Sequence, residues 1–158
     1  MIMQPSKLFF DLVEHFEGVK LNAYLDSASI ATIGIGTTVY PSGLPVKMGD
    51  KCTVDQAYEY LKHHVAKNVK IEGEFRQHEY DAILSLVYNI GQWAFNKSTL
   101  KKIIDAKRTD ENSIYNAFLM WNKASVKGVK IEIDGLTRRR KSEAFLFING
   151  YNHATFFE

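Results

Sequence analysis

The sequence lacks most of the features that mark secreted, membrane-spanning or nucleic-acid-binding proteins. Cys52 is the only cysteine in 158 residues, so no internal disulfide can form and packing alone must hold the fold. A net charge of +2 is too small to indicate a nucleic-acid partner, although residues 138–141 form one basic run. No apolar run approaches the ~20 residues of a membrane span, and the first residues lack the apolar segment of a secretory signal. These absences favour synthesis in a reducing cytoplasm and no stable membrane insertion.

Composition favours a folded chain of ordinary globular character. Hydrophobic residues make up 46% and charged residues 24% of the sequence, proportions that support a packed core and argue against disorder. The length fits one domain or two small lobes that share a core, because domains commonly run to about 100–150 residues. A separate second function is therefore not expected.

The first part of the sequence changes from a helical to an extended pattern. Apolar residues recur at helical spacing from Ser6 to Glu17, and Gly18 follows as a residue able to take positive φ at the helix end. Residues 21–40 are rich in Ser, Thr, Gly and β-branched side chains, which predicts a small antiparallel sheet of two or three strands.

The rest of the sequence is mainly helical. Thr53 and Gln56 have the form of a capping box that opens a long helix. The strongly apolar segment that ends at Gly91 is the best candidate for a central core helix. Further helices are expected after the caps Ser98 and Asp110 and from near Thr137 to Gly150, with a loop or short hairpin at 126–135.

These patterns predict an α+β fold with a small N-terminal α/β lobe, a larger helical C-terminal lobe and a cleft between them. The first lobe covers about residues 18–52, and a connecting helix covers about 53–72. The second lobe covers about residues 74–158 and includes the N-terminal helix.

Glu17 and Asp26 are candidates for the two carboxyl groups that glycoside hydrolysis requires. Glu17 would end a helix, where the negative end of the helix dipole and the apolar neighbour Phe16 disfavour ionisation, as a general acid needs. Asp26 would lie in a polar turn, which favours the ionised form. The hydroxyl of Thr32 can both donate and accept, so it can hold a water against Asp26.

Each of these residues also has an ordinary structural role open to it. Because the chain has 18 acidic residues, a Glu and an Asp at this separation occur readily by chance. Glu17 is also consistent with a solvated helix end, Asp26 with a turn residue and Thr32 with a plain strand threonine. From the residues alone, these structural roles are the more frequent ones.

The arrangement of these residues resembles a known family. Residues 17–26 read Glu-Gly-Val-Lys-Leu-Asn-Ala-Tyr-Leu-Asp, and Ala-Thr-Ile-Gly-Ile-Gly follows at 31–36. Eight residues separate Glu17 from Asp26, and five separate Asp26 from Thr32. This pattern is similar to the signature of phage T4-type lysozymes and related endolysins, glycoside hydrolase family 24.

Two later blocks extend the resemblance in the expected order. The first block comprises Gln77, 81–91, Phe95 and 98–100. The second block comprises Phe118, Trp121, Ala124, 135–136, 139–140 and Glu143. Similarity therefore runs from about residue 8 to about residue 147, and several blocks in order make chance a poor explanation.

The resemblance implies a lysozyme-like fold and an endolysin activity. Glu17 would be the acid, Asp26 the group that activates water, and Thr32 its positioning partner. The reaction would be hydrolysis, with inversion, of the β-1,4 bond between N-acetylmuramic acid and N-acetylglucosamine in bacterial peptidoglycan. Family members also place an arginine of the final helix near the acid, for which Arg139 is the first choice and Arg138 is nearly as good.

Three further residues correspond to substrate-binding positions of such enzymes. Tyr88 and Asn89 lie on the central helix, and Ser98 lies in another segment that approaches the sugar. Aromatic faces and amide groups suit saccharides, whose rings offer both C–H faces and hydroxyls. Tyr88 is equally suited to completing the core, and Ser98 to capping a helix.

The sequence departs from the family pattern at a few positions. Thr37 stands where a histidine is common, so any ion pair of that histidine is absent, which affects stability more than catalysis. Ser27 and Ser29 stand where many relatives have proline and glycine, so the turn after Asp26 can differ in shape.

No cofactor or metal is expected. His63 and His64 are adjacent and cannot both face one metal from a helix, and the Gly34-Ile35-Gly36 segment lacks the third glycine of a dinucleotide loop. The family resemblance further implies a monomer that causes host cell lysis, is made in the host cytoplasm and reaches the periplasm and cell wall through a separate holin.

Two alternatives stay open. A lytic transglycosylase uses a single glutamate and returns a 1,6-anhydro product, but Asp26 and Thr32 at the family spacing argue against it. A catalytically silent glycan-binding phage protein of the same fold is the second alternative, because fold alone does not establish function.

Overall fold

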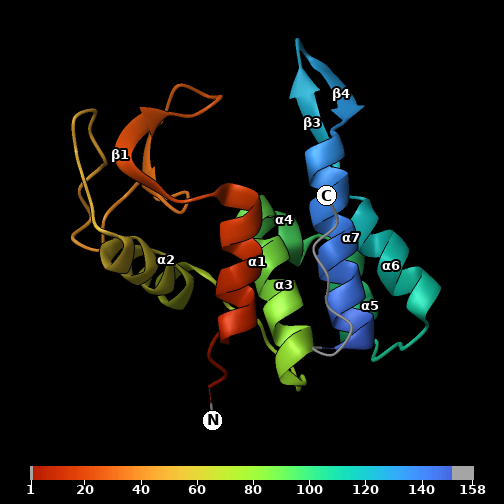
Figure 1. Ribbon diagram of the computed structural model, residues 1–158. Coiled ribbons are helices and arrows are strands. Elements are labelled where there is room, and N and C mark those ends of the chain that lie inside the picture. The colour runs from red at the N-terminus through yellow and green to blue at the C-terminus, as the bar shows by residue number, and fades with distance from the viewer. Residues whose placement is uncertain (1, 151–158) are drawn as a thin grey trace. The chain divides into compact units, whose positions relative to one another are not determined.

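The computed structural model describes residues 2–150 and divides them into two compact units (Figure 1). One unit comprises residues 10–69, and the other joins residues 2–9 to residues 70–150. The helices and short antiparallel sheets confirm the α+β class expected from the sequence. None of the helices in the described range has the length and apolarity that a bilayer-spanning segment needs.

The unit of residues 10–69 contains the sheet expected near the N-terminus. Strand β1 (Lys20–Leu25) pairs antiparallel with β2 (Ala31–Gly34), with Tyr24 opposite Thr32 and a bulge between Lys20 and Tyr24. Three isolated antiparallel bridges add to this sheet region outside the two strands. They pair Asn22 with Lys51, Ile33 with Thr37, and Val39 with Pro45.

Cys52 is buried beside this sheet. Its amide donates to the carbonyl of Leu21 at 2.9 Å, which ties the segment before the next helix to β1. Burial raises the pKa of its thiol. The only cysteine of the chain is therefore a small packing residue held in its neutral form.

Helix α2 (Val54–Asn68) begins at the capping box predicted from Thr53 and Gln56. The amide of Gln56 donates to Thr53 Oγ1 at 3.1 Å, and the amide of Thr53 donates to Gln56 Oε1 at 2.9 Å. The helix buries Ala57, Leu61 and Val65. The predicted start of the helix is confirmed.

The boundary between the units differs from the lobe boundaries expected from the sequence. Helix α1 (Lys7–Glu17) falls mostly in the unit of the sheet, as does α2. The reason is local contact, because the phenol of Tyr58 on α2 donates to the Glu14 carboxylate and its ring packs edge-on against Phe10 at 6.0 Å. The first residues belong to the other unit, where Ser6 bonds Asp81 of α3 (Gln77–Ile90).

Helix α3 is the centre of the helical unit. Residues 81–87 are all buried; five are apolar, as the pattern predicts, and Asp81 and Ser85 are polar. Helix α3 packs against α7, and α7 packs against α6 (Figure 1). The other elements of this unit are α4 (Gln92–Asn96), α5 (Thr99–Asp105), α6 (Glu111–Leu119), β3 (Lys123–Val126), β4 (Val129–Glu132) and α7 (Asp134–Asn149).

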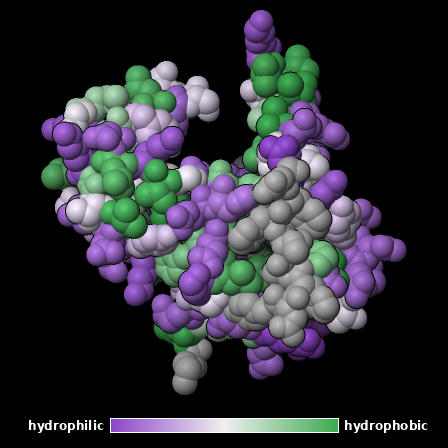
Figure 2. Space-filling model, viewed as in Figure 1, coloured by the Kyte–Doolittle hydropathy of each residue, from purple (hydrophilic) through white to green (hydrophobic). Residues whose placement is uncertain are grey.

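Strands β3 and β4 form a short hairpin, where the sequence predicted either a loop or a short hairpin at 126–135. Lys127 and Gly128 make the turn with φ values of 50° and 81°, a pattern suited to the right-handed twist of a hairpin. Val126 pairs with Val129, and both are exposed. Figure 2 shows the resulting apolar surface along the hairpin.

Three local expectations in the helical unit need correction. Helix α7 begins at Asp134, about one turn before Thr137. The Asp110 side chain does not cap α6; it pairs with Arg108 at 3.1 Å. The short helix α4 has no counterpart in the sequence prediction, since five residues are too few to show a helical period.

Gly34 is the point where the sheet touches α2, and an added side chain there should be costly. Gly34 has φ +66°, and a Cβ would lie 3.2 Å from both Cα and Cβ of Ala57. We expect Gly34→Ala to lower the free energy of unfolding by about 2–4 kcal/mol, from left-handed strain and crowding together. Urea denaturation followed by circular dichroism measures the change.

Gly43→Ala is the matched control, because Gly43 has φ +89° and open space around its Cβ position. It should lose only about 1–2 kcal/mol from backbone strain. Equal losses in the two variants would contradict the role of the contact with Ala57.

Candidate active site

Asp26 is fixed by the turn that joins β1 to β2. Its Oδ1 accepts from the amides of Ala28 at 2.8 Å and Ile30 at 2.9 Å, and its own amide donates to the Ile30 carbonyl at 3.0 Å. Ser29 reaches φ 62° to complete the turn. Both side-chain bonds end on Oδ1, so the turn orients the carboxylate while Oδ2 carries none of the bonds that form it.

Thr32 is held by the same peptide groups as Asp26. It is 3% exposed on β2, and its Oγ1 donates to the Ile30 carbonyl at 2.9 Å. The hydroxyl proton is thereby committed, and the oxygen lone pairs are left to accept. Ile30 thus links the two side chains through its N–H and its C=O.

Glu17 is the last residue of α1, as the sequence predicts, and it is half-buried. Gly18 follows with φ +74°, and its amide donates to the Glu14 carbonyl at 2.8 Å. The chain therefore turns directly from α1 into β1, so the end of the helix is followed at once by the sheet of the same unit.

Tyr24 lies within the electrostatic influence of both Glu17 and Asp26. The pKa of its phenol is raised, first by burial, then by the negative charge of Glu17 and by that of Asp26. Both carboxyl groups must therefore lie within electrostatic reach of one hydroxyl. The sequence prediction did not single out Tyr24, although its position two residues before Asp26 would place both on one face of a strand.

The other predicted site residues lie in the helical unit and have different surroundings. Asn89 is exposed near the end of α3, whereas Tyr88 is half-buried. Ser98 is 3% exposed, and its hydroxyl accepts from the amide of Lys101 at 3.0 Å and donates to the Phe95 carbonyl at 2.7 Å. The Ser98 side chain therefore caps α5.

The basic run splits into one exposed and two buried arginines. Arg139 and Arg140 are 4% and 0% exposed, and both pair with the fully buried Glu143, at 3.4 Å and 2.7 Å. Ser85 of α3 also donates to Glu143. Arg138 is exposed. Arg139, the first choice for a catalytic role, thus has an ion pair inside the α3–α7 contact, and Arg138 has the accessible guanidinium.

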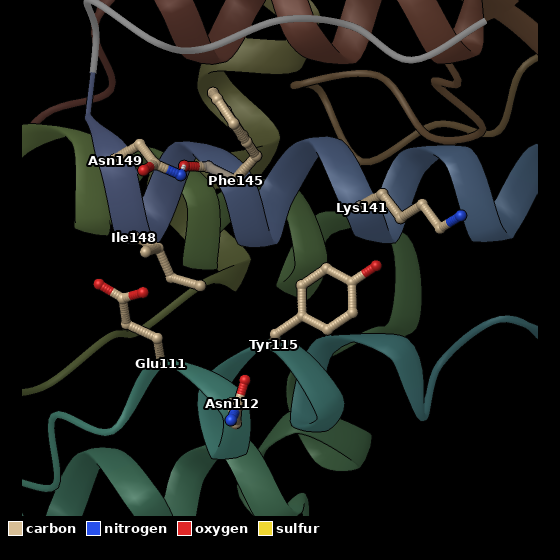
Figure 3. Close-up of a pocket in the computed structure, with 7 residues that line it drawn as sticks. All are labelled: Glu111, Asn112, Tyr115, Lys141, Phe145, Ile148 and Asn149. Carbon is tan, nitrogen blue, oxygen red and sulfur yellow. Dashed lines mark hydrogen bonds between the residues drawn. The ribbon is translucent and has the colours of Figure 1, made fainter.

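A groove of about 410 Å³ runs between α6 and α7 (Figure 3). Tyr115 and Ile148 contribute apolar surface, and Glu111 and Lys141 contribute opposite charges. None of the predicted catalytic residues lines it. In the described part of the chain, no group of three or more His, Cys, Asp or Glu side chains is arranged to hold a metal ion.

Comparison with known proteins places the chain in a family. The phage lysozyme family model matches residues 14–143. An endolysin of Acyrthosiphon pisum secondary endosymbiont phage 1 is 36% identical over 92% of this chain and 98% of its own, and the endolysin of Salmonella phage P22 is 33% identical over 94% and 100%. The solved endolysin of Escherichia coli O157:H7 phage FAHEc1 has a TM-score of 0.86 and 40% identity over 96% of this chain and 97% of its own.

The chain belongs to the phage lysozyme family. It is a lysozyme-type glycoside hydrolase with the α+β fold of the phage endolysins. The family resemblance inferred from the three sequence blocks is confirmed.

Removing the charge of Glu143 should destabilise the helical unit strongly. Glu143→Gln would remove the carboxylate with which both buried guanidinium groups pair, and breaking a buried ion pair in this way costs about 3–5 kcal/mol. Urea denaturation measures the loss. Arg138→Gln, an exposed change on the same helix, should stay within about 0.5 kcal/mol of the parent. A loss below about 1 kcal/mol for Glu143→Gln would mean that the buried cluster does not need its charge.

Proposed function

We propose that the protein is an endolysin muramidase. It hydrolyses the β-1,4 bond between N-acetylmuramic acid and N-acetylglucosamine in peptidoglycan, with inversion at the anomeric carbon. Glu17 is the general acid, and Asp26 with Thr32 manages the attacking water. The observation that carries this proposal is the attachment of Asp26 and Thr32 to the same Ile30 peptide groups, in the unit where Glu17 ends α1.

The geometry of Asp26 and Thr32 suits a water molecule that attacks. Thr32 already donates its proton to Ile30, so towards a water its oxygen can only accept. If the water donates one hydrogen bond to Thr32 Oγ1 and the other to the Asp26 carboxylate, its lone pair is free to attack the anomeric carbon. Asp26 then takes a proton as the new C–O bond forms.

Glu17 supplies the complementary proton. As the glycosidic C–O bond breaks, the protonated carboxyl transfers its proton to the leaving oxygen, so the leaving sugar departs as an alcohol. The reaction consumes one water and returns a reducing end. Glu17 loses a proton and Asp26 gains one, so the two carboxyl groups exchange protonation states in each turnover.

Residues of the helical unit are proposed to bind the substrate. Asn89 is exposed and offers an amide to sugar hydroxyls, and Tyr88 beside it offers an aromatic edge. Arg139 is the first choice for the functional arginine and Arg138 is nearly as good; Arg139 is buried and pairs with Glu143, and Arg138 is exposed. Ser98 contributes by holding the start of α5.

The proposed biological role is host cell lysis by a monomer made in the host cytoplasm. Its partner is the glycan strand of the periplasmic cell wall, and access to that wall would depend on a separate holin. The relatives named endolysin support this role.

Glu17→Gln should abolish wall clearing without unfolding the protein. The amide keeps the shape of the side chain but has no acidic proton to give, so we expect a loss of at least about 100-fold. Clearing of bacterial wall suspensions measures activity, and the thermal midpoint Tm verifies folding. Clearing by a folded Glu17→Gln at the parental rate would refute the acid assignment.

Mass spectrometry of the parent's products separates the reaction classes. Reducing muramic acid ends are expected, whereas 1,6-anhydro ends would assign a lytic transglycosylase. A folded parent that clears no wall and releases no fragments would be a silent glycan-binding protein.

The contribution of Thr32 to catalysis should depend on its hydroxyl. Thr32→Val removes the oxygen that accepts from the water and should lower kcat by roughly 100-fold, within the range for positioned proton-transfer partners. Thr32→Ser keeps the hydroxyl and should retain most of the activity. Initial rates on soluble glycan strands measure both, and equal rates in the two variants would remove Thr32 from the mechanism.

A further inference from the structure

Tyr24 shares one face of the sheet with Thr32 of the proposed water-handling pair. In the antiparallel register of β1 and β2, Tyr24 lies directly opposite Thr32, and directly opposed residues project to the same side. Asp26 follows two residues later, just past the end of β1, where its amide donates to the Ile30 carbonyl at 3.0 Å. The register therefore places Tyr24 opposite Thr32 and one residue from the turn that holds Asp26.

The electrostatic surroundings of Tyr24 add Glu17 to this group. Burial, Glu17 and Asp26 all raise the pKa of the phenol, in that order. A phenolate at this position would face two carboxylates, so the hydroxyl stays protonated across the range in which carboxyl groups titrate. Tyr24 therefore presents a neutral O–H donor where the two carboxyl groups act together.

Other tyrosines of this unit have structural partners. Tyr40 donates to Asp50 at 2.7 Å, and Tyr58 donates to Glu14. Asp50 also accepts from the Lys47 amide at 2.9 Å, so the Tyr40 bond closes a loop. The carboxylates near Tyr24, by contrast, are the two that the proposed mechanism uses.

We propose that Tyr24 is a positioning residue of this site, whose neutral hydroxyl donates into the space shared by the Glu17 and Asp26 carboxyl groups and keeps them aligned with Thr32. This proposal rests on the proposed function for its catalytic meaning. Two carboxyl groups that exchange protonation states in each turnover pass through arrangements in which both carry charge. A donor that never ionises there lowers their mutual repulsion without competing for the transferred proton.

Tyr24→Phe and Tyr40→Phe form a matched pair, since each removes one hydroxyl from the same unit. Tyr24→Phe should lower kcat about tenfold, with KM within about twofold of the parent and Tm unchanged. Tyr40→Phe should lower Tm, because it breaks the bond to Asp50, and should leave kcat unchanged. A kcat for Tyr24→Phe within about twofold of the parent, with or without a fall in Tm, would overturn the proposal.

The titration of Tyr24 itself gives a readout that needs no activity. NMR of ring-labelled tyrosine follows the phenol, and Tyr24→Phe assigns its signal. The pKa of Tyr24 should fall towards 10.0 in Glu17→Gln and in Asp26→Asn, because each change removes one of the charges that raise it. Tyr58→Phe is a control that should leave Tyr24 unmoved. A Tyr24 pKa unchanged in both carboxyl variants would overturn the shared position.

These experiments separate this proposal from the proposed function. If Glu17→Gln keeps parental activity, the acid assignment fails, while the titration of Tyr24 still reports its placement. If Glu17→Gln is inactive and Tyr24→Phe has the parental kcat, only the positioning role fails.

Discussion

The peptide groups of Ile30 are the point on which the proposed chemistry depends. The N–H of Ile30 holds Asp26, and its C=O holds Thr32 while also closing the turn with the Asp26 amide. These bonds are short-range and lie within a single tight turn, so the two side chains cannot move independently. Because Oδ1 is occupied by backbone amides, the direction of Oδ2 is set by the turn, not by substrate.

The turn also limits what the sequence can tolerate there. Ser29 adopts φ 62°, a conformation that a side chain rarely takes. The serines at 27 and 29, noted as departures from the family pattern, do not prevent the turn from forming. The hydrogen bonds to Asp26 therefore outweigh the backbone strain at Ser29, whose cost is of the order of 1 kcal/mol.

Sequence reasoning succeeded where the signal is local. The end of α1 at Glu17 and Gly18 and the capping box at Thr53 depend on residues within four positions of each other. The buried segment 81–87 is equally clear, because five of its seven residues are apolar. The sequence prediction assigned the N-terminal helix to the second lobe, whereas residues 10–69, with Glu17, Asp26 and Thr32, form one unit.

Sequence reasoning was incomplete where tertiary packing decides which partner a side chain takes. Three consecutive arginines are equivalent in sequence, yet only Arg139 and Arg140 face Glu143. Their separations of four and three residues from Glu143 are the helical spacing of ion pairs, a signal that was present but weaker than the family analogy. Asp110 has the residue type of a cap, but Arg108 offers its carboxylate a charged partner, and sequence alone does not rank the two.

The buried thiol of Cys52 has a consequence for where this fold can exist. A single cysteine that is buried and held in its protonated form has little reactivity towards oxidants or other thiols. Formation of the native structure needs no oxidising partner, and its persistence needs no reductant. The molecule is therefore covalently the same in reducing and oxidising surroundings, and its stability does not depend on the redox potential of the compartment it occupies.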